Sequence, residues 1–301
     1  MRKIVSWVLL GVGAFLLVTA VVASVWAPGQ VKRAPIDTDS TTRLAGTAER
    51  LDASAGEVVD LDVRAVSITE ADSNASDDEI VVYVNTVCLV VDVPDTPDCG
   101  EPGTGEDADP NVINIATDVF ATDRETGLAV NDPEYLPADA EPHEGLVNKF
   151  PFDTEKKDYP FWDGVLDRAV TAQYVGETTI DGLDVYEFNY VVEEEPATVV
   201  GDIEGLYSMD KTIWAEPRTG KIVDQEQHDV RTLEDGSPLL DLRLAFTDEQ
   251  VAADVADAED SLDSLNLLTR TVPIVGYVAG PLLILVGAGM LLMAAARSRR
   301  A

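Results

Sequence analysis

This chain of 301 residues contains few of the residue types on which most catalytic and metal-binding sites depend. It has only two Cys and two His. Two Cys cannot form a four-cysteine zinc site, and neither His143 nor His228 lies near a nucleophile motif. The motifs of serine hydrolases, zinc proteases and phosphate-binding loops are also missing. The sequence therefore predicts no catalytic residue, no metal site and no cofactor, and we expect a protein that is not an enzyme.

Basic residues are scarce as well. The chain has 21 Lys and Arg against 56 Asp and Glu, which gives a formal charge of −35. Such a surface would repel phosphates, so the charge argues against a nucleic-acid-binding protein. Because hydrophobic residues make up 46% of the chain, it is also unlike a disordered acidic polymer.

Charge is completely absent from two long apolar runs near the ends of the chain. The first covers residues 4–26 and the second covers residues 272–296. About 20 apolar residues in a helix cross the core of a bilayer, so each run is long enough to be a transmembrane helix. Trp26 and Tyr277 lie near the ends of these runs, where aromatic residues meet the membrane interface.

Basic residues outside the two runs set the predicted orientation. Arg2 and Lys3 precede the first run, and Arg297, Arg299 and Arg300 follow the second, with no acid in either tail. The positive-inside rule then places both termini in the cytoplasm. We expect an uncleaved signal anchor at the N-terminus, the alternative being a cleaved signal peptide. The predicted parts are 1–26 (cytoplasmic tip and anchor), 27–271 (extracytoplasmic domain of net charge −40), 272–296 (second helix) and 297–301 (cytoplasmic tail).

The region between the two helices is rich in β-strand patterns. Residues 58–66, for example, place Val59, Leu61 and Val63 on one face and Asp60 and Asp62 on the other. Polar turns such as Asp181-Gly182 separate the strands, as expected for antiparallel hairpins. The expected strands are 57–68, 79–93, 112–122, 169–178, 184–192, 211–215, 221–232 and 239–246.

One amphipathic helix is expected after the last strand. Thr247 can cap it, with Gln250 as its capping-box partner, and an apolar stripe follows from Val251 to Leu265. The fold class is therefore an α+β membrane protein. Two transmembrane helices flank a large, mainly antiparallel β ectodomain, built as a curved sheet, barrel or sandwich, with a C-terminal amphipathic helix.

Three further features suggest sites. Cys88 and Cys99 are even in number and lie in the predicted outer domain, which favours a disulfide over two free thiols. Gly276 and Gly280 form a GxxxG motif that would allow close packing of a second helix, first of all the chain's own. The acidic runs at Asp77 and Asp107 could offer oxygen atoms to calcium, although a solvated acidic surface is the simpler interpretation.

The densest aromatic segment covers residues 149–163, KFPFDTEKKDYPFWD. Its aromatic side chains could line a groove for an acyl chain or glycan, with two lysines meeting an anionic head group. The alternative is an irregular arm whose aromatic rings plug one end of the sheet. The candidate ligand-binding residues are Phe150, Phe152, Lys156, Lys157, Tyr159, Phe161 and Trp162.

This aromatic segment, the hairpin at 210–220 (DKTIWAEPRTG) and the two terminal apolar runs together resemble an actinobacterial envelope family, known as DUF3068 or PorA-like porins. The resemblance covers nearly the whole chain. It implies a cell-envelope protein, with a channel activity attributed to some members. It implies no catalytic residues.

Three functions follow as hypotheses. The first is a membrane-anchored envelope protein whose ectodomain binds or transfers a lipid or envelope glycolipid. The alternative is a porin-like, pore-forming protein, and the third is a scaffolding ectodomain without a ligand. The expected partners are the lipid bilayer and an envelope lipid or glycolipid, without nucleic acid, and the oligomeric state stays open.

Overall fold

The computed structural model describes residues 2–52, 56–99, 109 and 111–298. The chain divides into two compact units. One contains residues 1–33 and 260–301, and the other contains residues 34–259. Arg299, Arg300 and Asp107, which the sequence analysis singled out, lie outside the described residues.

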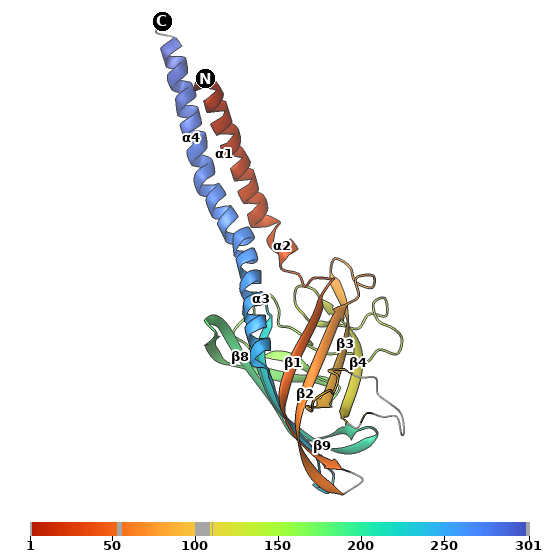
Figure 1. Cartoon of the computed structure of the whole chain (residues 1–301). Coiled ribbons are helices and arrows are strands. Elements are labelled where there is room, and N and C mark those ends of the chain that lie inside the picture. Colours follow the sequence, from red (N-terminus) through yellow and green to blue (C-terminus); the bar gives the residue numbers. More distant parts are fainter. Residues whose placement is uncertain (1, 53–55, 100–108, 110, 299–301) are drawn as a thin grey trace. The chain divides into compact units, whose positions relative to one another are not determined.

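The first unit is helical (Figure 1). Helix α1, Arg2–Val25, covers most of the first charge-free run, and the short α2, Pro28–Val31, follows it. Helix α4, Val272–Ser298, covers the second run. Two stretches are long and apolar enough to cross a membrane: α1, and the continuous helix over residues 248–297 that contains α4.

The second unit is one strongly curved antiparallel sheet of eleven strands (Figure 1). Because every strand among the described residues belongs to this single sheet, the described part of the unit is not a sandwich. The strand order is β5-β4-β3-β2-β1-β11-β10-β9-β8-β7-β6. The strands are β1 (Asp39–Asp52), β2 (Glu57–Ala71), β3 (Ile80–Val91), β4 (Val112–Asp123), β5 (Ala129–Val130), β6 (Tyr159–Asp163), β7 (Arg168–Ile180), β8 (Leu183–Val200), β9 (Ile203–Ala215), β10 (Ile222–Leu233) and β11 (Pro238–Phe246).

The sequence analysis missed strand β1, which lies at the centre of the sheet between β2 and β11. Its sequence, DSTTRLAGTAERLD, is mostly polar and small, so it lacks the apolar alternation of a half-buried strand. Among the side chains described in this strand, only Leu44 and Ala48 are buried. A Cβ at Gly46 would overlap the carbonyl oxygen of Arg243 in β11, so the strand needs glycine at this point.

Three other strand predictions need correction. Strand β8 continues to Val200 and β9 begins at Ile203, because the ladder is interrupted only at Glu193 and Glu194 and pairing with β9 resumes at Glu195 despite the polarity of this run. Strand β6 lies in the aromatic segment 149–163, for which the sequence analysis predicted no strand. Pro160 is compatible with this outermost strand, since a proline there removes no hydrogen bond between central strands. The two-residue β5 was too short to predict from periodicity.

The predicted hairpin turns are confirmed. Asp181 and Gly182 both have positive φ, 49° and 92°, between the paired residues Ile180 and Leu183. This is the geometry of a two-residue type I′ turn. The turns at 216–220 and 123–127 also end in glycines with positive φ.

One short segment joins the two outer edges of the curved sheet. The Ala129 N–H at β5 donates to the Gly145 carbonyl at 2.8 Å. Leu146 donates to the Pro160 carbonyl at 2.8 Å and accepts from the Trp162 N–H at 2.7 Å, both in β6. The segment Gly145-Leu146 therefore links the ends of the sheet along a short part of their length.

Helix α3, Asp248–Asn266, begins where the sequence predicts. The Gln250 N–H donates to Thr247 Oγ1 at 3.2 Å, so Thr247 is the predicted cap. The predicted return bond from the Gln250 side chain is wrong, because its Oε1 accepts the Arg43 N–H of β1 at 3.0 Å. Helix α3 continues through a short π-helical stretch, Leu267–Thr271, into α4.

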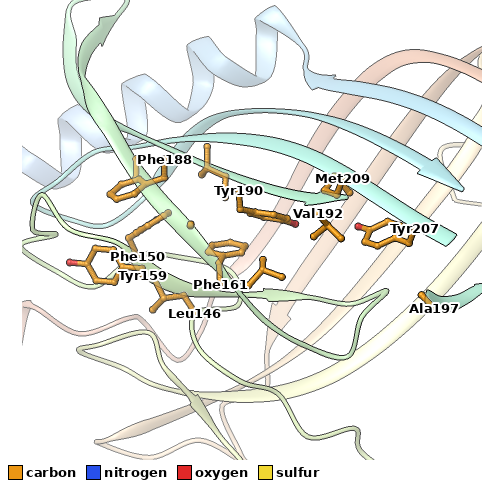
Figure 2. Close-up of a cluster of buried hydrophobic side chains, with 14 of the residues drawn as sticks. Leu146, Phe150, Tyr159, Phe161, Phe188, Tyr190, Val192, Ala197, Tyr207 and Met209 are labelled. Carbon is orange, nitrogen blue, oxygen red and sulfur yellow. The ribbon is translucent and has the colours of Figure 1, made fainter. Parts of the chain in front are cut away.

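A large core cluster is built from strands β6 to β9 together with Leu146 and Phe150 (Figure 2). The ring of Phe150 stacks on that of Phe188 with 4.3 Å between centroids, and meets Tyr159 edge-on at 5.6 Å. Such offset and edge-to-face pairs stabilise a core beyond the area that they bury. Farther along, Tyr190, Tyr207 and Met209 extend the cluster.

Candidate functional site

The aromatic residues predicted to bind a ligand lie mainly in the protein core. Phe150 is fully buried, and Phe161 and Tyr159 are 3% and 7% exposed. Phe152 is half-buried beneath the ammonium group of Lys149, which lies 3.8 Å from its ring centroid. Trp162 packs on His143, with 4.4 Å between the ring centroids. The rings are therefore in contact with protein rather than lining an open groove.

The two lysines of the same segment point to nearby acids. Lys156 Nζ lies 2.5 Å from Glu177, and Lys157 pairs with Glu155. Both lysines are exposed, and these hydrogen bonds raise the pKa of each. This placement gives no support to an anionic head-group site next to the aromatic rings.

A buried polar cluster, which the sequence analysis missed, lies deeper in the same core. The carboxylate of Asp163, 2% exposed, accepts hydrogen bonds from Tyr207 at 3.0 Å and Tyr190 at 3.2 Å. Its other oxygen accepts the N–H groups of Val165 and Leu166 at 3.0 and 3.1 Å. Burial and the neighbouring Asp163 raise the pKa of both tyrosines, so both remain protonated donors.

Two basic residues and a second buried acid complete this cluster. Arg231 of β10 binds the buried Asp229 at 2.7 Å and donates to the Val199 carbonyl at 2.8 Å. Lys211 of β9 lies 5.6 Å from the ring centroid of Phe161, and burial lowers its pKa to about 8. The cluster has two acids, two bases and two phenols, but no nucleophile activated by a base. Its geometry fixes four strands together and does not form a catalytic set.

The sequence did contain a signal for this cluster. In the run YSMDKTI at 207–213, Lys211 occupies the alternation of Tyr207, Met209 and Ile213, which forms the buried face of β9. A charged residue on the apolar face of a strand is unusual and indicates a buried partner. Asp229 follows the same rule in β10.

His143 joins β4 to the segment that follows β5. It is 3% exposed, with Nε2 2.8 Å from Asp118 and Nδ1 2.9 Å from the Glu141 carbonyl oxygen. Both ring nitrogens face acceptors, and only the imidazolium form donates from both. Burial lowers the pKa of His143, but the bonds to Asp118 and Glu141 outweigh it and the net pKa is raised.

This geometry predicts a pH dependence of stability. A group whose pKa is higher in the folded state than in the unfolded state stabilises the folded state. This contribution is fully present below the unfolded pKa, near 6.5 for His, and is lost as the pH rises through the folded pKa. We expect the free energy of unfolding, measured by urea titration, to fall as the pH rises above about 6.5, the unfolded pKa of His. His143→Gln should flatten this decrease, because it removes the ring that bonds to Asp118 and to the Glu141 carbonyl. An unchanged slope in His143→Gln would contradict the assignment.

The acidic loop considered for calcium is satisfied by the protein itself. One oxygen of Asp77 accepts the N–H groups of Glu79 and Ile80, each at 2.8 Å, and the other accepts the Tyr135 hydroxyl at 2.7 Å. These bonds lower the pKa of Asp77. Within the described ranges, no three His, Cys, Asp or Glu side chains gather in a way that could hold a metal ion.

The two long apolar helices pack directly on each other (Figure 1). A Cβ built at Gly276 would lie 2.5 Å from the Leu16 carbonyl oxygen, and one at Gly280 would lie 2.8 Å from the Leu17 side chain. Gly287 approaches the Ser6 carbonyl in the same way, at 2.9 Å. The GxxxG residues of α4 therefore lie against α1, and the backbones are too close to leave a lumen between these helices.

The outer faces of the helix pair are apolar. Large exposed side chains include Val8, Phe15 and Val22 of α1 and Val278 and Leu285 of α4. No charged residue lies in 4–26 or 272–296. The helix pair of one chain thus offers a surface suited to lipid and no charged lining for water or ions.

Comparisons with known proteins agree on one family. The family described as Porin PorA matches residues 5–289. A Porin PorA of Corynebacterium amycolatum is 33% identical over 94 residues, which cover 27% of this chain and 24% of that relative. The chain therefore aligns with about a quarter of that protein's length. A Porin PorA of Corynebacterium resistens is 25% identical over 425 aligned positions, covering 99% of this chain and 98% of the relative.

Proposed function

This chain belongs to the PorA porin family, and on that premise we propose that it is a membrane-anchored, pore-forming protein of the cell envelope. The observation that carries the proposal is the extent of the family match, which includes both apolar helices and the β unit. The arrangement in the membrane is part of the proposal: α1 and α4 cross the bilayer, both termini are cytoplasmic, and the acidic β unit faces outward. No catalytic activity is assigned.

The packing of the helices constrains how a pore could form. The close approach of Gly276 and Gly280 to α1 leaves no channel within one helix pair. The outer faces of the helix pair are apolar and suited to contact with lipid. A water-filled path, in contrast, needs polar groups along its wall. We therefore propose that several chains assemble around the conduction path, and that the hydrophilic part of this path is lined by the acidic β unit.

The charge of the region between the two apolar runs predicts the ion selectivity. Residues 27–271 carry all 56 acids of the chain and a net charge of −40. A path lined by this surface would concentrate cations and repel anions. Because salt screens charge over about 10 Å at 0.1 M, the preference for cations should weaken as salt is raised.

The test is the electrical conductance of the full chain in planar lipid bilayers. We expect stepwise conductance, a reversal potential in a KCl gradient that favours potassium over chloride, and a smaller preference at higher ionic strength. A variant that lacks residues 272–301 is the control and should be silent. Bilayers that stay silent with the full chain would overturn the proposal and leave the scaffolding hypothesis.

Lipid binding, our first hypothesis from the sequence, has less support. Its candidate rings, Phe150, Tyr159 and Phe161, are core residues. Two shallow hollows of about 370 and 350 Å³ flank Val191 of β8, but both are open surface features and not an apolar tunnel. We therefore place the pore-forming function ahead of it.

A further inference from the structure

One long stretch of strand edge in the β unit has no hydrogen-bonded neighbour. Strand β4 pairs with β3 along almost its whole length, but β5 pairs only with Ala121 and Thr122. Along residues 112–120, no other strand in the described part of the chain pairs with the far side of β4. The link through Gly145-Leu146 reaches β5 and β6 and leaves this stretch uncovered.

Residues 114–118 of this edge have few of the features that usually prevent strand addition, and the one irregularity of pairing, at Ile113, lies just before them. Natural edge strands are protected by lysines, prolines, bulges of the chain away from the edge, or inward charges. The run VINIATDVF at 112–120 has no Lys, Pro or Gly and a single charge, Asp118. Even that carboxylate is paired, 2.8 Å from Nε2 of the buried His143. The low charge of this stretch of β4 is close to that of β3, which has no charged residue and is paired with a strand on each side.

The exposed side chains on this edge are small or neutral. Asn114, Ala116 and Thr117 are exposed, and the Thr117 hydroxyl is 3.0 Å from that of Thr86 in β3. No bulky or charged group among them would obstruct an incoming strand. In a domain of net charge −40, such a neutral edge is where a second acidic chain can approach with the least repulsion.

We infer that residues 114–118 of β4 pair with the same residues of a second copy of this chain, extending the sheet across a two-fold axis. Two identical antiparallel edges are self-complementary by symmetry, and main-chain hydrogen bonds provide the affinity. In a register centred on Ala116, Asp118 lies opposite Asn114 of the partner chain, so no like charges face each other. The need for more than one chain rests on the proposed function, but the test below does not depend on conductance.

The test is the assembly state of the full chain in detergent, measured by light scattering and native mass spectrometry over a range of concentrations. We expect dimers or larger even assemblies, with slower amide hydrogen exchange in β4 as the assembly forms. Ala116→Lys and Ala116→Glu should each raise the dissociation constant at least roughly tenfold, because either charge blocks strand addition. Thr47→Lys, an exposed change on the central strand β1, is the control and should leave assembly intact.

The variants Ala116→Lys and Ala116→Glu distinguish strand pairing from an effect of net charge alone. If association depended only on net charge, Ala116→Lys would strengthen it and Ala116→Glu would weaken it. Because the acidic units repel each other, assembly should also tighten as salt is raised from low to physiological levels. A chain that stays monomeric at all concentrations, or assemblies that both variants leave intact, would overturn the inference. A monomer that still conducts would refute strand pairing while leaving the pore function standing.

Discussion

Asp163→Ala should lower the free energy of unfolding of the β unit by about 3–5 kcal/mol. The carboxylate is the shared acceptor for Tyr190, Tyr207 and the N–H groups of Val165 and Leu166. Each buried donor left without a partner costs about 1–3 kcal/mol, because it has lost water without gaining a new acceptor. The expected loss is less than the sum, since the two N–H groups are only partly buried and water can reach them.

The measurement is urea unfolding of the full chain in detergent, followed by the β-sheet signal in circular dichroism. Asp184→Ala is the matched control, because that carboxylate lies exposed on β8 and its loss should change stability by less than about 0.5 kcal/mol. Tyr207→Phe removes one donor and keeps the acceptor, so its effect should be much smaller than that of Asp163→Ala. An Asp163→Ala variant as stable as the Asp184→Ala control would show that the buried cluster does not hold the strands together.

Breaking the disulfide should cost roughly 3 kcal/mol in the chain-entropy description of a short closed loop. Cys88, which is fully buried in β3, is bonded to Cys99 across a separation of 11 residues. Cys99→Ser is the most informative change, because it opens the loop while leaving the buried Cys88 side chain in place. Thermal and urea unfolding should both show the loss, and a thiol assay should detect one free cysteine.

A second set of contacts ties the same loop to the sheet and provides the comparison. Arg64 of β2 binds Asp92 at 2.7 Å and Asp98 at 3.2 Å. These ion pairs involve exposed carboxylates, so Arg64→Ala should cost about 1 kcal/mol or less. If Cys99→Ser and Arg64→Ala have equal effects, the covalent bridge adds nothing beyond the contacts of the loop.

The strands found from the sequence had either a wet face and a dry face or, like β3, a nearly continuous apolar run. Strand β2 alternates valine and leucine with aspartate, and this pattern survives in the structure. Strand β1 could not be found in this way, because its neighbours on both sides supply the apolar surface that its own sequence lacks. Similarly, the aromatic residues at 150, 159 and 161 were visible as a dense group, but periodicity could not say whether they face a ligand or the core.

Local features of the chain were thus determined by the sequence itself: the two charge-free helices, the hairpin turns, the helix cap at Thr247 and the acidity of the central region. Each depends on residues close together in the chain, so composition and spacing are sufficient. The tertiary structure alone decided which side chains share an interior. It brought Asp163, Tyr190 and Tyr207 together from three strands, placed the aromatic rings in the core, and left one side of β4 without a neighbour. Those outcomes depend on strand order and register, which are set by contacts between residues far apart in the sequence.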